Sequence, residues 1–493
     1  MRPSELTRSV GLLGSQRLVS AGLGVVRTKV AAALLGPSGV GLLALAISLR
    51  DLLRSLSTLG SPNGFLKLVA QERGEGDLRG LETLLSSVFV LFGVLAAVIA
   101  CLCFVGAAPI AEAVFDDAGR GPLVIAVALS LLFLVPVVLV GKVFAGLLEY
   151  RTYALLAIGE ASVAVVATGG LAAAFGLDGA VWALVFVEIC AFVASVYLLR
   201  RRVLGPLGLR LQVAWPDRDV LRRVLRLASA LALTSLAATT AALLVRSEIV
   251  RSFGSAANGH YQVAWQVGQN YLGFLGAALW SYGMPRVATE LADPDAVVAT
   301  QNQFLRIALL LFAPGIVVLL VSRAVWIPVL FSDAFLAGGA MLCWQLMGEL
   351  AAMLRQAMNI SLLPRERLRF LVGQGLAYWG LWVLVSYALL AHLGPLAAAV
   401  GYLVANAVLL VATYAYHREV LGFRIHPANR RILLSTVPGF AVCGVLTTAD
   451  DLIVGRLVPL VLTALWGVVH REDLRRLAGV GAGTAARGDA TST

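Results

Sequence analysis

The chain has 493 residues, of which 59% are hydrophobic and 14% are charged, and its formal net charge at pH 7 is +11. Soluble proteins are typically about 45–50% apolar and about 25% charged, so this composition excludes a soluble catalytic domain. The positive charge falls at helix ends and in short loops, as membrane topology requires, and this distribution argues against nucleic acid as a partner.

Long apolar stretches recur along the whole chain, and about 20 such residues suffice to cross the roughly 30 Å hydrocarbon layer of a bilayer. The sequence therefore predicts an all-α polytopic membrane protein with fourteen helices, of which the last two are additions to a twelve-helix core. In chain order the predicted helices are residues 10–35, 40–64, 85–108, 122–148, 152–175, 180–199, 228–252, 260–285, 305–321, 336–362, 370–391, 397–416, 432–449 and 452–469.

The distribution of basic residues predicts that both termini lie inside. Only Arg120 and Arg323 fall in predicted outer loops, whereas most of the other basic residues fall in inner loops and tails. The outer loops are too short to hold a folded domain. The longest inner loop spans residues 200–227, and its segment 217–226 has the pattern of a basic amphipathic helix lying on the anionic inner leaflet.

The sequence contains a weak internal repeat. Residues 27–71 and 246–290 each show a charged helix end, an LG or FG turn, a glycine-rich restart and a polar helix. An even number of helices per half gives the halves the same orientation, an arrangement in which substrate binds between them. The predicted division is an N-lobe over residues 1–227, a C-lobe over 228–417, and two further helices with a tail over 418–493.

Four arginines lie within the first two predicted helices. Arg17 and Arg27 share one face of the first helix, and Arg50 and Arg54 share one face of the second. A charge at the bilayer centre costs roughly 2.5–3.5 kcal/mol on insertion scales, so such residues usually face a cavity or a partner. Arginine suits a phosphate-bearing headgroup because its planar guanidinium forms bidentate hydrogen bonds, and one interpretation is therefore a cationic cavity.

The other interpretation is that these arginines pair with acids inside the membrane and only lock helices together. The available acids are Asp51, Glu160 and Glu188. Embedded cations outnumber deep acids in the first half, which favours the cavity. If transport is coupled to protons, the candidate groups are Glu160, Glu188 and Glu349, because carboxylates inside membrane proteins commonly form proton relays.

The second half carries amides where the first carries arginines. Amides and aromatic rings suit sugar hydroxyls and sugar faces, so these residues are predicted sugar contacts. Hydrogen bonding between helices is the alternative interpretation of the same pattern. The residues concerned are Gln262, Gln266, Gln269 and Asn270 on the eighth helix, and Gln345 and Asn359 on the tenth.

No catalytic motif is present in the sequence. There is no phosphate-binding glycine loop for ATP, no HExxH motif and no set of cysteine and histidine metal ligands. The five cysteines all lie in apolar stretches and are predicted to be free thiols. We therefore expect no cofactor, no metal and no enzymatic activity.

Several motifs resemble those of a known family. LLGPSGVGLL at 34–43 and SLRDLLRSLSTLGSPNGFLKLVAQ at 48–71, followed by LLEYRTY and GEAS, resemble the O-antigen translocases. These are repeat-unit flippases of the multidrug/oligosaccharidyl-lipid/polysaccharide (MOP) exporter superfamily. The last two predicted helices depart from the shorter translocases and are similar to the lipid II flippases.

The resemblance implies two six-helix lobes around a cationic cavity in the bacterial cytoplasmic membrane. It implies transport of undecaprenyl-pyrophosphate-linked oligosaccharide from the inner to the outer leaflet, with the pyrophosphate bound by Arg17, Arg27, Arg50 and Arg54. The bilayer, the lipid-linked glycan and other polysaccharide-assembly membrane proteins are the expected partners. The alternatives are a lipid II flippase or another MOP exporter and, in a different class, a membrane polysaccharide polymerase or ligase, which would need a larger outer loop.

Overall fold

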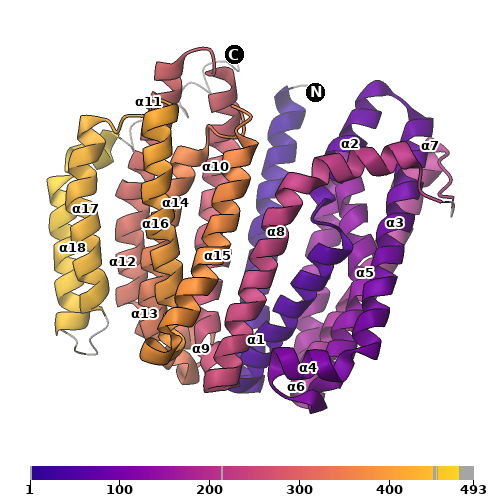
Figure 1. Cartoon of the computed structure of the whole chain (residues 1–493), viewed down its shortest axis with the longest axis horizontal. Helices are drawn as coiled ribbons and strands as arrows, with labels where there is room; N and C mark the ends of the chain where they lie inside the picture. The colour runs from indigo at the N-terminus through magenta and orange to yellow at the C-terminus, as the bar shows by residue number, and fades with distance from the viewer. Residues whose placement is uncertain (1–2, 213–214, 448–450, 452, 477–493) are drawn as a thin grey trace. The chain divides into compact units, whose positions relative to one another are not determined.

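The computed structural model describes residues 3–212, 215–447, 451 and 453–476, and every regular element within these residues is helical (Figure 1). Eight stretches are long and apolar enough to cross a membrane, and the longest of them contain a kink or two consecutive helices. The predicted class, an all-α polytopic membrane protein, is confirmed. The number of fourteen spans stays a prediction.

The long N-terminal helices overlap the predicted ones, with ends that differ by up to about ten residues, and short helices are present that the hydropathy pattern does not separate. The ranges are α1 Pro3–Ser57, α2 Pro62–Glu75, α3 Leu78–Val105, α4 Ala107–Phe115, α5 Gly121–Gly146, α6 Tyr150–Leu199, α7 Gly205–Leu207 and α8 Arg218–Phe253. The later ranges are α9 Ser255–Gln266, α10 Gly273–Thr289, α11 Pro294–Ile307, α12 Ala313–Val321, α13 Arg323–Leu330, α14 Gly339–Asn359, α15 Leu368–Leu393, α16 Ala397–Val420, α17 Pro427–Leu446 and α18 Val458–Val469.

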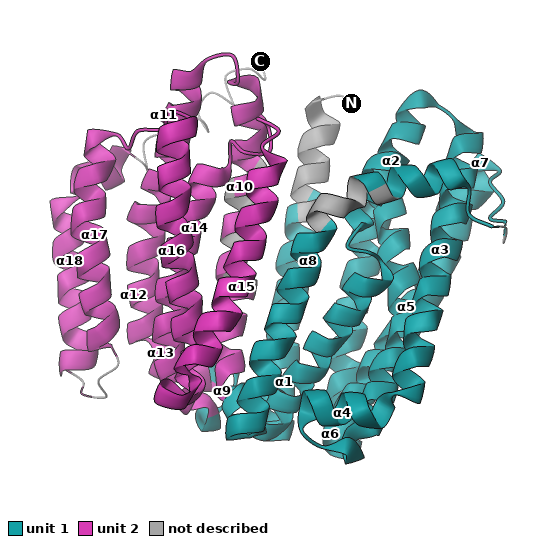
Figure 2. Ribbon diagram, viewed as in Figure 1, with its two compact units in different colours: residues 1–259, 329–334 teal, residues 260–328, 335–493 magenta. Residues whose placement is uncertain are grey.

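The chain divides into two compact units (Figure 2). Unit 1 comprises residues 1–259 with 329–334, and unit 2 comprises residues 260–328 with 335–493. Helix α8 packs against α1, α2, α3 and α4, so it belongs to unit 1. The division by contacts therefore falls after Gly259, one helix later than the lobe boundary predicted at residue 227.

The internal repeat is visible in the backbone. Three turns with a positive φ recur at a spacing of 218 residues, and the φ values within each pair agree to within about 20°. The pairs are Gly36 with Gly254, Leu148 with Glu366, and Gly176 with Gly394. Because a positive φ is unfavourable for residues other than glycine, its recurrence at equal spacing indicates two copies of one scaffold.

Unit 1 contains a close backbone contact made by equivalent glycines of the two copies. A Cβ atom at Gly41 would lie 1.9 Å from the Ser255 carbonyl oxygen, and one at Gly259 would lie 2.0 Å from the Pro37 carbonyl oxygen. The buried Asn258 side chain donates a 2.7 Å hydrogen bond to the Gly41 carbonyl oxygen. Glycine is therefore required at both positions for α1 and the first turn of α9 to approach this closely.

The predicted amphipathic segment 217–226 is helical and is continuous with the helix that follows it. It forms the first turns of α8, whose N-cap is Asp217. Val220 and Val224 are buried in the core of unit 1, and Arg223 donates to the Glu72 carboxylate at 2.9 Å. The apolar face of this segment is thus covered by unit 1, while its arginines are exposed. Its position on the inner leaflet stays a prediction.

Candidate functional site

Unit 1 contains a partly open cavity of about 330 Å³ between α1 and α6. Each of these helices is broken once, at Gly36 and at Gly176. Segments on both sides of each break contribute to the wall, so residues far apart in the sequence meet there. The lining residues are Gln16, Ser20, Leu23, Gly24, Arg27, Arg50, Ala157, Glu160, Ala161, Ala164, Leu184, Val187 and Glu188.

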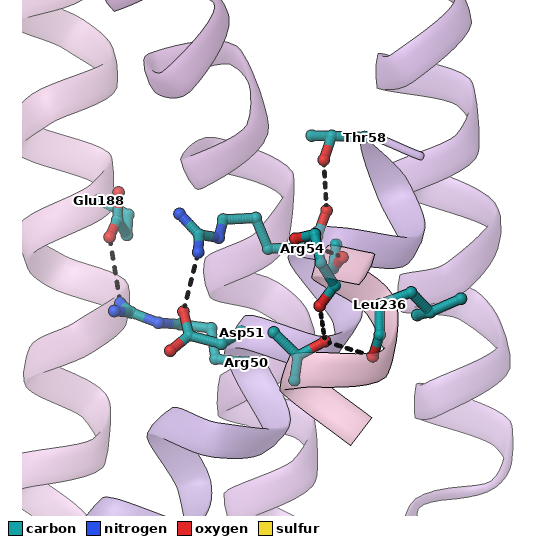
Figure 3. A network of polar contacts seen from close by, with 9 residues as sticks. Arg50, Asp51, Arg54, Thr58, Glu188 and Leu236 are labelled. Carbon is teal, nitrogen blue, oxygen red and sulfur yellow. Dashed lines mark hydrogen bonds and ion pairs between the residues drawn. The ribbon is translucent and has the colours of Figure 1, made fainter. Parts of the chain in front are cut away.

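Arg50 and Glu188 form an ion pair in the cavity wall (Figure 3). The Arg50 Nη1 atom lies 3.1 Å from Glu188 Oε1, and the two side chains are only 17% and 3% exposed. Arg50 Nε and Glu188 Oε2 are buried and have no hydrogen-bond partner among the described residues. The pair therefore keeps one unused donor and one unused acceptor beside the cavity.

The other two charged residues of the cavity are Arg27 and Glu160. The Arg27 Nε atom donates to the Thr168 hydroxyl at 3.1 Å, which fixes the guanidinium against α6. Within the described part of the chain neither Arg27 nor Glu160 has an ion pair. The two arginines and two glutamates would together carry no net charge when all four are ionised.

Arg54 and Arg17 lie apart from this cavity. Arg54 pairs with Asp51 at 3.4 Å, and about two fifths of each side chain is exposed. Figure 3 shows the Arg54 guanidinium turned toward Asp51, one turn back along α1, while Arg50 reaches Glu188. The Arg17 side chain is exposed and does not line the cavity. The structure thus brings together Arg27 and Arg50 but neither Arg17 nor Arg54, and it adds two of the proposed ion-coupling acids.

Unit 2 contains a buried polar network around Glu349 on α14. The Gln269 amide donates to Glu349 Oε1 at 3.3 Å and to the Tyr402 hydroxyl at 2.9 Å, and the Gln345 amide donates to the same Glu349 oxygen at 3.5 Å. Gln269 lies in a π-helical segment, Val267–Leu272, within the α9–α10 run. A Cβ atom at Gly268 would lie 2.4 Å from Glu349 Oε1, so glycine there makes room for the carboxylate. Such π-helical turns are frequent at functional sites.

A second part of this network surrounds Arg355 and Asn359. The Arg355 guanidinium donates to Gln374 at 3.1 Å and to Asn406 at 3.3 Å, and it lies over the ring of Tyr378. The Asn359 amide donates to Gln374 Oε1 at 2.6 Å. These bonds join α14 to α15 and α16, which is the interhelical arrangement that the sequence allowed as the alternative to sugar binding.

The predicted sugar contacts have different surroundings in this conformation. Gln345 and Asn359 are buried. The Gln262 amide donates to Gln266 at 3.3 Å. The side chain of Asn270 lies outside the described residues.

Hydropathy did not single out several residues that complete these sites. Thr168 lies in a predicted helix whose polar positions are few, and Gln374 and Tyr402 lie on helices that the pattern marks only as apolar. Gln374 could have been identified from the sequence as a candidate site residue, because it is a polar residue isolated in an apolar helix. No such signal distinguishes Thr168 from a threonine that bonds within its own helix.

Known membrane transporters have a similar fold. The fold is similar to that of an inward-facing multidrug resistance MATE family transporter of the MOP superfamily, with a TM-score of 0.68 at 15% identity over 84% of this chain and 96% of that one. It is also similar to the lipid II flippase MurJ in an inward closed conformation, with a TM-score of 0.71 at 13% identity over 95% of this chain and 100% of that one. The chain thus has the fold of these MOP-superfamily transporters and the composition of a polytopic membrane protein.

The family is defined by sequence. Residues 30–338 match the model of the family described as polysaccharide biosynthesis protein, and the chain belongs to that family. A relative named lipid III flippase, from Escherichia coli (strain K12), is 25% identical over 389 residues, which are 78% of this chain and 92% of that protein. The resemblance seen in the opening motifs is thereby confirmed at the level of the family, and the chain is a transporter rather than an enzyme.

Proposed function

We propose that this protein flips undecaprenyl-pyrophosphate-linked oligosaccharide repeat units from the inner to the outer leaflet of the bacterial cytoplasmic membrane by alternating access. Membership of the polysaccharide biosynthesis family supports a lipid-linked glycan as the substrate. The observation that carries the proposal is the membrane-embedded cavity holding Arg27 and Arg50, since guanidinium groups bind phosphates through paired hydrogen bonds.

The pyrophosphate competes with Glu188 for Arg50 in this proposal. Glu188 holds Arg50 in the absence of substrate, and the free Nε atom of Arg50 offers an additional donor. Transfer of a proton to Glu188 releases Arg50 and leaves the cavity with a net positive charge, which favours an anionic headgroup. Arg27, held by Thr168 and without an ion pair among the described residues, supplies the second guanidinium.

Arg17 and Arg54 have a different place in the proposal. Neither lines the cavity, so we propose that they meet the pyrophosphate only on its way in or out. Gln262, Gln266 and Gln269 are proposed to contact the sugars, and Glu160, Glu188 and Glu349 to couple transport to protons. Asn270 is likewise proposed as a sugar contact. For the buried Gln345 and Asn359 a sugar contact is proposed for another state of the transport cycle.

Proteoliposomes test the proposed function directly. A fluorophore on the sugar of an undecaprenyl-pyrophosphate oligosaccharide is bleached from outside by dithionite, so flipping converts a protected fraction into an accessible one. We expect the wild-type protein to expose the protected fraction without any nucleotide. We expect an Arg27→Ala, Arg50→Ala, Glu188→Gln variant to lose this activity and an Arg202→Ala control to retain it. Arg202 is exposed, lies in the predicted inner loop and does not line the cavity.

The same assay distinguishes the proposed function from the main alternative, a lipid II flippase. Labelled lipid II replaces the oligosaccharide lipid in a parallel set of vesicles. Faster exposure of lipid II than of the oligosaccharide lipid would transfer the assignment to a lipid II flippase. No exposure of either lipid by a folded protein would contradict transport of lipid-linked glycans altogether.

A further inference from the structure

A second cavity lies in unit 2 and has no place in the transport mechanism above. It measures about 790 Å³ and is bounded by α11, α14, α16 and α17. Its floor is apolar and closed by the buried side chains of Leu354, Met358 and Phe423. Its rim carries Val411 and Leu434, whose side chains are 69% and 65% exposed, as expected for residues that face lipid.

Three arginines stand at one end of this cavity, where the predicted inner loop joins α16 to α17. Arg418 is in the last turn of α16, Arg424 is in the connecting loop, and Arg430 is in the first turns of α17. All three are exposed. Within the described residues none of their guanidinium groups has an ion pair, so their charges are not neutralised by the protein.

The loop that carries Arg424 is held in place by a buried residue on α11. The Asn302 side chain donates to the Arg424 carbonyl oxygen at 2.9 Å and accepts from the His426 amide at 2.8 Å. The Asn429 side chain in turn donates to the Asn302 carbonyl oxygen at 2.7 Å. These bonds involve the main chain and not the arginine side chains, so the loop is fixed while the guanidinium groups stay available.

We propose that this cavity binds an anionic phospholipid of the inner leaflet. The phosphodiester lies between Arg418, Arg424 and Arg430, and the acyl chains follow the apolar wall past Val411 and Leu434. Basic clusters at the cytoplasmic membrane surface recognise anionic lipids in this way. A soluble anion would gain nothing from the apolar floor. Tyr414 is the only uncharged polar residue in the lining, which does not suit a glycan.

Native mass spectrometry of the purified protein tests this proposal. The protein is equilibrated with micelles that contain equal amounts of dioleoyl phosphatidylglycerol and dioleoyl phosphatidylcholine, and the lipids that remain bound are measured. The test variant carries Arg418→Gln, Arg424→Gln and Arg430→Gln. The control variant carries Arg367→Gln, Arg369→Gln and Arg431→Gln, which removes three exposed charges of the predicted inner side that do not line the cavity.

We expect the wild-type protein and the control variant to retain phosphatidylglycerol in preference to phosphatidylcholine. Each basic residue near an anionic lipid surface strengthens binding about fivefold, so the test variant should bind phosphatidylglycerol roughly a hundredfold more weakly. If the triple variant does not fold, Arg424→Gln alone should still weaken binding about fivefold, since Asn302 contacts only the main chain there.

Three results would overturn the proposal. The first is equal phosphatidylglycerol retention by the test variant and the wild-type protein. The second is equal retention of phosphatidylcholine by the wild-type protein, since the zwitterionic lipid carries no net charge for the arginines to recognise. The third is displacement of phosphatidylglycerol by an equimolar amount of undecaprenyl phosphate, which would assign the cavity to the polyprenyl substrate instead.

Discussion

At the scale of single residues, Arg50 and Glu188 form a largely buried ion pair in unit 1. Among the described residues, each loses its one ionic partner if the other is removed. Breaking a buried ion pair by removing one partner typically costs about 3–5 kcal/mol, because an uncompensated charge remains in the interior. The effect of a substitution here therefore mixes a loss of folding with a loss of binding, and the two must be separated.

We predict that Arg50→Ala reduces the amount of folded protein in the membrane. The cause is the buried Glu188 carboxylate left without a partner. Adding Glu188→Gln should restore the protein level without restoring transport. Quantitative immunoblotting of membranes, read beside the vesicle assay, measures both. Transport by the folded double variant at the wild-type rate would remove Arg50 from the binding site.

We predict that Arg54→Ala leaves the protein level unchanged. Its pair with Asp51 is two fifths exposed on both sides, and such pairs contribute about 0.2–1 kcal/mol or less. The measurement is the amount of Arg54→Ala protein in the membranes, compared by immunoblotting with the amount of Arg50→Ala protein. A fall in abundance equal to that of Arg50→Ala, reversed by Asp51→Asn, would show that this pair is structural.

The sequence allowed the positions of these arginines to be predicted better than their partners. Helical periodicity placed Arg50 on a polar face, and Asp51, one of the three acids named as available partners, lies three residues before Arg54 on the same helix. Glu188 lies 138 residues from Arg50 along the chain, so no local pattern connects the two. Periodicity also grouped Arg17 with Arg27, but it cannot show that only the second of these reaches a cavity.

At the scale of helices, the contact between Gly41 and Gly259 fixes how α1 meets the start of α9. A Cβ atom added at either glycine would lie closer to a carbonyl oxygen than Cβ atoms do in real proteins. We predict that Gly259→Ala sharply lowers the yield of folded protein, since the carbonyl at Pro37 belongs to the main chain and cannot rotate away. Gly93→Ala on α3 is the matched control, because a Cβ atom there meets nothing within 4 Å.

Thermal unfolding of the two purified variants in detergent measures the difference. Gly93→Ala should be as stable as the wild-type protein or slightly more stable, since alanine favours a helix over glycine by about 1 kcal/mol. An unchanged unfolding temperature for Gly259→Ala would mean that this contact opens without cost. Apolar length predicted where these helices lie, whereas the glycine contact depends on three-dimensional proximity that hydropathy does not contain.

At the scale of the whole molecule, topology is the property that the sequence predicts most directly. The bias of arginine toward alternate loops puts both termini and residues 200–227 on the cytoplasmic side. The ends of α5, α14 and α15 fall close to the predicted ones, because the change from apolar to charged residues marks them. Helices α8 and α11 begin about ten residues before the predicted starts, because charged and polar residues continue these helices beyond their apolar stretches. The breaks at Gly36 and Gly176 are also consistent with pairs of spans that the hydropathy pattern separates.

Cysteine labelling in whole cells checks the predicted topology. In a variant without its five native cysteines, of which Cys101 is exposed, single cysteines are introduced at Ala118 and Trp215. We expect a membrane-impermeant maleimide to label Ala118→Cys in intact cells and Trp215→Cys only after permeabilisation. Trp215 is 96% exposed, so access does not limit the reaction. The opposite labelling pattern would show that the predicted orientation of the spans is wrong.

The recurring positive-φ turns also bear on how the two halves of the chain are related. Leu148 and Glu366 share no side-chain chemistry, yet both hold a left-handed conformation that costs a residue other than glycine roughly 1–2 kcal/mol. Two unrelated side chains would not adopt the same unfavourable turn at equivalent positions by independent accident. The two turns therefore point to one helical scaffold present twice in the chain. Arginines in the first copy and amides in the second stand on this shared arrangement of turns, so one backbone pattern carries two different polar surfaces.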